Sequence, residues 1–419
     1  MIGLCDMRSF YCACEKVFRP DIRDSGVVVT SNNDGVVVAL DDRAKAVGIK
    51  KFEPYFKQRG LIERAGVLAF SSNYELYGEV SARIMATLAE LAPNGIEVYS
   101  IDECFVDFSA VPRHELKAFA AMLRDTIWRQ QGITMGVSIA PTKTLAKLGQ
   151  CATKLFPQID GVCVLEHEAQ WQWLAARVNV NETWGIGRKL TRKLRARGIN
   201  TVADLSEVTQ TDAQTLQGIT LVRTVRELQG EPCIDMDCQP QPKQNIISSR
   251  SFGQKQTCLK PLQEAVSHYA VRAGSKLRAQ SSLCFRLSAW LQTSAHDAKP
   301  CADELSATLS GGTADSRELS RVAVALVARL YRPGYKYAKA GVMLQDIRPE
   351  QFAQQDLLSP RSENAARLMA VVDDVNARFG SGAIKLARQG GAAGFAMKRA
   401  MKSPSYLTRW HEIPHIKLG

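Results

Sequence analysis

The feature that most constrains this chain is a pair of adjacent carboxylates, Asp102 and Glu103, between two β-rich runs within 98–108. Side chains of a regular strand alternate between faces, so both acids reach one site only at a strand end or tight turn, and the surrounding residues predict a hairpin. Two carboxylates held close repel each other unless a cation neutralises them, and a divalent metal is the usual one. Asp6, after the strand-like run 2–5, is the candidate third acid of a two-metal site for phosphoryl transfer. The alternative is a solvated acidic turn.

Length and composition indicate a globular protein of several domains. At 419 residues the chain exceeds a single core, so about two to four domains are expected. Hydrophobic residues make up 45% and charged residues 23%, as in soluble proteins. No apolar run reaches the roughly 18 residues of a membrane span, and Asp6 and Arg8 interrupt any apolar core of a signal peptide. The eleven cysteines include no Cys-x-x-Cys pair, so we expect reduced thiols and a cytoplasmic location.

The positive charge of the chain is concentrated. Of a net charge of +12, a large share lies in 243–347, which holds 15 Lys and Arg against 7 Asp and Glu. A second cluster, 188–197, has six basic residues and no acid. Focused positive charge predicts a polyanionic partner, most simply nucleic acid. The alternative is a solvated basic surface.

The N-terminal part alternates between strand and helix patterns. Two valine runs around Asp34-Gly35 predict a hairpin, and Leu76, Val80, Ile84 and Leu88 have helical spacing. After Pro141-Thr142 a helix carries Lys143 and Lys147 on one face. The expected elements are a strand at 2–5, a helix from 10, a hairpin at 27–39, a helix at 74–91, the acidic hairpin, a helix at 112–131, a strand at 134–139 and a helix from 142. This order predicts an α+β fold, a sheet with helices on one face.

A glycine turn followed by a basic helix lies within 184–205. Gly185 and Gly187 precede Arg188 and Lys189, an arrangement that presents backbone N–H groups to a phosphate. It resembles a helix-hairpin-helix, which grips the DNA backbone independently of sequence. A purely structural αα-hairpin is the alternative.

A proline-rich linker at 239–244 precedes a last periodic region. The region reads strand, helix, strand, strand, helix, strand at 246–252, 261–280, 283–292, 305–310, 316–331 and 341–347. This β-α-β-β-α-β order is typical of a ferredoxin-like split unit. Its basic surplus predicts a separate DNA-gripping domain, with Arg250 a candidate contact, and a partly ordered tail follows from 348.

Several motifs together resemble the Y-family translesion DNA polymerases. They are 6–15 (DMRSFYCACE), 100–103 (SIDE) and 145–148 (LAKL). Three more resemble the UmuC-like branch, which includes plasmid-borne mutagenesis proteins: 31–35 (SNNDG), 70–77 (FSSNYELY) and 224–233 (TVRELQGEPC).

The resemblance implies a right-hand polymerase with a ferredoxin-like palm. Its parts would be the palm (1–24 and 75–168), small inserted fingers (25–74), a thumb with the helix-hairpin-helix (169–238), a little finger (243–347) and a C-terminal tail (348–419). The implied activity is error-prone synthesis past damaged template in SOS mutagenesis and DNA repair. The implied partners are primer–template DNA, dNTP, a processed UmuD-like dimer, the RecA filament and the sliding clamp.

The resemblance also assigns site residues. Asp6, Asp102 and Glu103 would hold two Mg²⁺ ions, with the backbone carbonyl of Met7 as a further ligand. Among the remaining positions, Tyr11 would be the steric gate against a ribose 2′-hydroxyl, Phe10 would line the same pocket, and Lys45 and Lys147 would contact the triphosphate. Core aromatics and surface lysines are the plain alternatives for these four.

Three departures from the family pattern affect these assignments. Arg8 stands where many members have a second acid, and we expect it not to bind metal. Asp41-Asp42 precede Lys45, and Asp42 would repel a triphosphate unless it points away or pairs with Arg43. In the tail, Gln354, Leu357 and Leu358 resemble a clamp-binding peptide, with Leu358 replacing a phenylalanine.

Two rival functions remain open at this point. One is a non-catalytic scaffold on stalled primer ends, and the other is a metal-dependent nuclease using the same acids.

Overall fold

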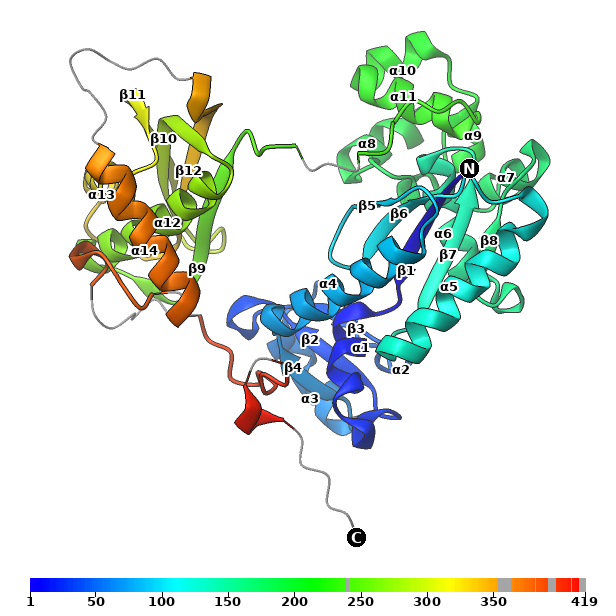
Figure 1. Ribbon diagram of the computed structural model, residues 1–419, viewed down its shortest axis with the longest axis horizontal. Coiled ribbons are helices and arrows are strands. Elements are labelled where there is room, and N and C mark those ends of the chain that lie inside the picture. The colour runs from blue at the N-terminus through cyan, green and yellow to red at the C-terminus, as the bar shows by residue number, and fades with distance from the viewer. Residues whose placement is uncertain (238–240, 353–362, 381, 391–396, 408, 414–419) are drawn as a thin grey trace. The chain divides into compact units, whose positions relative to one another are not determined.

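The computed structural model describes residues 1–237, 241–352, 363–380, 382–390, 397–407 and 409–413 (Figure 1). The chain divides into two compact units, Met1–Pro240 with Ala400–Gly419, and Gln241–Arg399. No described helix combines the length and apolarity that a membrane span needs. The finer domain boundaries predicted within the first unit stay predictions.

The centre of the first unit is a five-stranded sheet in the order β5-β6-β1-β7-β8 (Figure 1). Its strands are β1 (Ile2–Met7), β5 (Ile96–Val98), β6 (Glu103–Asp107), β7 (Met135–Ala140) and β8 (Val162–Val164). Strand β1 pairs antiparallel with both β6 and β7. The predicted acidic hairpin is confirmed, because β5 and β6 pair antiparallel across a four-residue turn.

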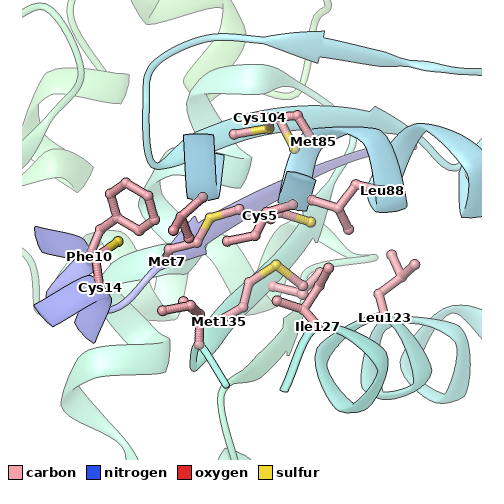
Figure 2. Close-up of a cluster of buried hydrophobic side chains, with 14 of the residues drawn as sticks. Cys5, Met7, Phe10, Cys14, Met85, Leu88, Cys104, Leu123, Ile127 and Met135 are labelled. Carbon is pink, nitrogen blue, oxygen red and sulfur yellow. The ribbon is translucent and has the colours of Figure 1, made fainter. Parts of the chain in front are cut away.

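Helices cover both faces of this central sheet, so the predicted restriction to one face is wrong. Cys5 and Cys104 face the helices α4 (Tyr74–Leu91) and α5 (Leu116–Gln131), where Met85, Leu88, Leu123 and Ile127 pack against them (Figure 2). Leu4 and Phe105, next to those cysteines in sequence, belong to a second core with the helix α6 (Lys143–Leu155). Adjacent strand residues point to opposite faces, and both kinds are apolar here, which is the pattern of a sheet buried on both sides.

The predicted hairpin at 27–39 is confirmed and belongs to a small separate sheet. Strands β2 (Val27–Thr30) and β3 (Val37–Leu40) pair antiparallel, and β2 pairs parallel with β4 (Leu68–Ser71). The turn contains a short 3-10 helix, η2 (Asn32–Asp34). The helices around this sheet and before it are α1 (Phe10–Val17), η1 (Pro20–Ile22), α2 (Asp42–Ala46) and α3 (Tyr55–Arg64).

The remainder of the first unit up to 237 is mainly helical. It consists of η3 (Arg113–Glu115) beside the sheet, then η4 (Pro157–Ile159), α7 (Glu168–Ala175), η5 (Val180–Glu182), α8 (Arg188–Arg195), α9 (Val202–Ser206), α10 (Gln210–Gln217) and α11 (Ile219–Leu228). Leu190 and Leu194 of α8 are buried in the core shared with α6, whereas its basic residues are exposed. The basic helix predicted after the glycine turn is therefore present and amphipathic.

The second unit has the predicted β-α-β-β-α-β order. Its elements are β9 (Ile246–Gln256), α12 (Leu259–Ala279), β10 (Ser282–Thr293), β11 (Ala302–Thr313), α13 (Ser316–Leu330) and β12 (Tyr337–Pro349). The strand order is β11-β10-β12-β9, so the second and fourth strands are central. The corresponding strands of the first unit are β1, β5, β6 and β7. Of these four, the first and the third, β1 and β6, are central. One element order thus gives two different sheets in this chain.

The region after 349 contains more regular structure than the sequence indicated. Helix α14 (Glu363–Phe379) belongs to the second unit, where Asp373 binds Arg278 of α12 through two hydrogen bonds of 2.6 and 2.7 Å. Short 3-10 turns η6 (Glu350–Phe352), η7 (Ala387–Gln389) and η8 (Trp410–Glu412) complete the described elements. The described residues of 400–413 return to the first unit.

Candidate active site

The three candidate acids lie at neighbouring ends of β1 and β6 in the central sheet. Asp6 of β1 lies directly opposite Glu103 of β6 in the antiparallel register, and such cross-strand partners point to the same face. Asp102 ends the turn before β6, where its carbonyl accepts a 2.9 Å hydrogen bond from the Met7 N–H. The turn itself is closed by the N–H groups of Tyr99 and Ser100, which both donate to the Glu103 carbonyl. The predicted hairpin thus places Asp102 in its turn and Glu103 at the start of β6, and the sharing of one site by the two side chains stays a prediction.

Each carboxylate has a polar partner. Lys154 Nζ lies 2.8 Å from Asp6 Oδ2, Lys147 Nζ lies 2.7 Å from Glu103 Oε2, and the Ser100 hydroxyl donates to Asp102 Oδ1 over 2.6 Å. Burial lowers the pKa of Lys154, but the Asp6 carboxylate outweighs it, so the pKa is raised overall. Two lysines thus supply the positive charge that clustered acids require.

The donor set fits a hard divalent cation. Asp6 is only 9% exposed, and carboxylate oxygens are the ligands that Mg²⁺ takes in proteins. Among the described residues, no three acidic, histidine or cysteine side chains stand in ligand positions, since the acids point to Lys147, Lys154 and Ser100 instead. A cation at these strand ends would therefore take over the charge role of the two lysines.

Met7 and Arg8 flank the first acid. The Met7 side chain is buried in the core (Figure 2), which leaves only its backbone carbonyl for the role that the resemblance implies. Arg8 donates to the carbonyl of Thr153 on α6. Its guanidinium is a cation held against this helix, and that it binds no metal stays an expectation.

The two candidate pocket aromatics on α1 lie in different environments. Phe10 is 3% exposed and packs in the core with Met7 and Cys14 (Figure 2), so the structure places it in the plain core role. Tyr11 is half-buried and stacks on Tyr77, with ring centroids 4.6 Å apart and planes at 16°. Burial raises the pKa of Tyr11 to about 12, so its hydroxyl stays protonated near neutral pH.

The two candidate triphosphate lysines also differ. Lys147 lies over the Tyr99 ring at 4.2 Å and beside Trp184, whose Nε1 donates to the Tyr99 hydroxyl. Glu103 and these aromatics fix its ammonium group. Lys45 is exposed on α2.

The contacts around α2 show how Asp41 and Asp42, the two acids before Lys45, are accommodated. Asp41 caps α2 by accepting from Ala44 N–H at 2.8 Å and pairs with Lys16 at 2.5 Å. Asp42 is exposed, and Arg43 pairs with Asp24 at 2.7 Å. Of the two alternatives for Asp42, pairing with Arg43 is not found, because that guanidinium pairs with Asp24.

The predicted DNA contacts fall in two places. Gly185 has φ +84°, and an added Cβ at Gly187 would meet open space. Gly187 is the N-cap of α8, and Arg188 and Lys189 are exposed in its first turn. Arg250 of β9 alternates with Ser249 and Ser251 and shares the helix-covered face of its sheet with Ile246 and Phe252, so its placement gives the predicted DNA contact no support.

The clamp-binding candidates Gln354, Leu357 and Leu358 lie outside the described residues.

Sequence reasoning missed three residues that organise this site. Lys154 follows Lys147 by seven positions, a helical repeat that could have revealed it. Glu227 of α11 is fully buried against the start of α6, and Tyr77 is fully buried behind Tyr11. Both lie in quoted motifs, but nothing in the spacing predicts their long-range partners.

Comparisons with known proteins show the fold and the family of this chain. The fold is that of a Y-family polymerase: a chimera of the Y-family DNA polymerases Dbh and Dpo4 superimposes with a TM-score of 0.66 at 20% identity, over 83% of this chain and 99% of that one. Residues 5–150 match the impB/mucB/samB family, 243–357 match its C-terminal domain, and 366–416 match a domain of unknown function, DUF4113.

A curated relative of full length shows the family, and another is similar to half of this chain. Protein UmuC of Salmonella typhimurium is 43% identical over 423 aligned positions that cover all of both chains. A DNA polymerase IV of Alkalilimnicola ehrlichii is 31% identical over 50% of this chain and 58% of its own. The chain belongs to the impB/mucB/samB family, of which UmuC is a member.

Proposed function

We propose that this chain is a translesion DNA polymerase that adds deoxynucleotides to a primer opposite damaged template. The observation that carries the proposal is the placement of Asp6 directly opposite Glu103, with Asp102 beside them in the turn before β6. Its support is a family relative that is a DNA polymerase and a fold shared with Y-family polymerases. A divalent cation is the cofactor that such a donor set fits, and we assign two Mg²⁺ ions to it.

Each residue of the site has a distinct task in this proposal. Bound Mg²⁺ would supply activation of the primer 3′-hydroxyl and charge neutralisation at the pyrophosphate. Asp6, Asp102 and Glu103 would hold the ions, with the Met7 carbonyl as a further oxygen. Lys147 is held between Glu103 and Tyr99, where a point charge can meet an incoming triphosphate.

Selectivity and a second cationic contact come from two other positions. The half-buried Tyr11 would place its ring against the ribose 2′-hydroxyl of an incoming nucleotide, and Lys45 provides an exposed cation on α2.

Helix α8 is the DNA grip in this proposal. Its first-turn N–H groups and the exposed Arg188, Lys189, Arg192 and Lys193 lie on one accessible surface. None of these four side chains has an ion-pair partner within the described part of the chain, so all four charges can go to phosphate. Such contacts are independent of base sequence and release counterions.

Replacing Arg188 and Lys189 together by Glu should weaken binding to primer–template DNA at every sequence. The slope of log K against log salt should fall in size by about 1.8, since each lost phosphate contact removes about 0.9. The measurement is fluorescence anisotropy over a salt series. Arg129→Glu on α5 makes the same kind of charge change at an exposed site and should have a smaller effect. An unchanged slope in the α8 variant would remove the helix from the interface.

Primer extension separates the polymerase from its two rivals. With Mg²⁺ and dNTPs, a polymerase lengthens a labelled primer past an abasic site, a nuclease shortens it, and a scaffold binds it without change. We expect lengthening. The reaction should be run with and without a processed UmuD-like dimer and RecA, the partners that the family relationship suggests, and with a sliding clamp.

A further inference from the structure

The family domain of unknown function at 366–416 is divided between the two units. Its helix α14 lies in the second unit, whereas residues from Ala400 onward pack in the first. We call residues 400–406 the C-terminal brace. The brace packs beside β4 and the start of α4, two elements of the first unit (Figure 1).

The first set of contacts fixes the η2 turn. Ser71, at the end of β4, donates its N–H to the Met401 carbonyl at 3.0 Å and accepts from the Met401 N–H at 2.9 Å. The Ser71 hydroxyl in turn donates to Asp34 Oδ1 at 2.6 Å, and the Ala400 N–H donates to Asp34 Oδ2 at 3.1 Å. Both oxygens of Asp34 are thus engaged by the brace or by a residue that the brace holds. Asn33 and Asp34 have φ of 61° and 51°, a costly conformation that needs such support.

The second set of contacts lies at the start of α4. Asn73 caps this helix and donates its side-chain amide to Ser403 Oγ at 2.9 Å. Asn73 is 1% and Ser403 is 6% exposed, so water cannot replace this bond. The Tyr406 ring stacks on Phe18 at 4.9 Å and joins the core of the first unit.

A buried carboxylate connects this second set to Tyr11. Glu15 is fully buried and accepts a 2.6 Å hydrogen bond from the Tyr77 hydroxyl, and Tyr77 stacks face to face on Tyr11. Burial raises the pKa of Glu15, while the hydroxyls of Tyr77 and Ser403 and the charge of Lys402 oppose the rise. The brace therefore contributes to the environment that holds Glu15, and Glu15 holds the ring behind Tyr11.

We propose that the C-terminal brace is a positioning element of the nucleotide pocket, which fixes the Asn32–Asp34 turn and the Glu15–Tyr77–Tyr11 stack and thereby sets the affinity and sugar selectivity for the incoming nucleotide. The inference rests on the proposed polymerase function for its kinetic consequence. It gives a task to residues 400–406 of the domain of unknown function. Because the brace touches Tyr11 only through other residues, it acts on selectivity by position.

The test uses two variants of the full chain, Ser403→Ala and Tyr406→Ala, each of which carries a single substitution. In single-nucleotide incorporation, KM for dNTP should rise and the preference for dNTP over rNTP should fall, each about five- to tenfold, since small misplacements of positioning groups have effects of this size or larger. The Kd for primer–template DNA and kcat at saturating dNTP should change less. A loss of folded protein alone would lower kcat and leave KM and sugar preference unchanged, which would overturn the proposal.

Three controls make the result specific. Tyr406→Phe keeps the ring that stacks on Phe18 and should behave as wild type. Trp410→Ala changes a side chain that is 89% exposed and should also be silent. Tyr11→Ala removes the gate itself and sets the upper limit of lost sugar preference.

Hydrogen exchange distinguishes failure of the brace from failure of the proposed function. Amides of 31–36 and 73–78 should exchange faster in both brace variants and not in Trp410→Ala, whether or not the chain extends primers. Faster exchange without any extension by wild type would uphold the brace and reject the polymerase function. Unchanged exchange together with unchanged KM would reject the brace.

Discussion

Asp102→Asn should reduce nucleotide incorporation by about a thousandfold or more, because metal-ion catalysis contributes several kcal/mol of transition-state stabilisation. The amide keeps the size of the side chain and its 2.6 Å contact with the Ser100 hydroxyl remains feasible, but one negative charge is lost from the metal site. The measurement is the single-turnover rate on a primer–template with Mg²⁺ and the correct dNTP. DNA affinity should stay within about threefold of wild type, since the helix α8 contacts are unaffected.

Asp107→Asn is the matched control for this loss of charge. Asp107 lies on the same strand β6, opposite Ile2 at the far end from Glu103, and its oxygen accepts from Ser109 N–H. The same chemical change there should leave the rate near that of wild type. If Asp102→Asn retained more than about a tenth of the wild-type rate, the assignment of this carboxylate to the metals would be wrong, since one tenfold step is only about 1.4 kcal/mol.

The parts of the fold that could be predicted are those set by short-range patterns. The helix Tyr74–Leu91 has the predicted bounds because its apolar residues repeat at helical spacing and Asn73 caps it. The acidic turn was predictable because neighbours in sequence stay neighbours in space. The prediction that Asp6 lies near Glu103 was also correct, but it rested on the expectation that a two-metal site needs a third acid.

The parts that could not be predicted depend on contacts between distant segments. Nothing in a β-α-β-β-α-β pattern says which strands become central, and the two units of this chain make different choices. Apolar alternation was too weak to show that α6 covers the second face of the central sheet. The placement of residues 400–406 beside Ser71 and Asn73 joins positions about 330 apart, which no local signal encodes.

Glu227→Ala should destabilise the first unit by about 3–5 kcal/mol, the largest effect on stability that we expect from a single polar substitution. Glu227 is fully buried, and its Oε2 accepts from the N–H and the hydroxyl of Thr144 at 2.9 and 2.7 Å. Its Oε1 accepts from the N–H groups of Cys233 and Ile234, both at 3.1 Å. Alanine would leave these four donors without their acceptor, the two of Thr144 in the buried interior, and it would remove an anion from the N-terminus of α6.

Urea unfolding followed by hydrogen exchange measures this effect separately in each unit. Peptides of the first unit should lose protection at lower urea in Glu227→Ala, and peptides of 246–347, which belong to the other unit, should not change. Glu231→Ala alters a neighbouring but exposed acid that pairs with Arg226, so its transition should stay close to that of wild type. An equal shift in both units would contradict the local role of Glu227. The expected selective shift would mean that the buried carboxylate of Glu227 on α11 anchors α6, the helix whose Lys147 and Lys154 pair with Glu103 and Asp6. The stability of the contact between α11 and α6 and the geometry of the acids would then depend on the same residue.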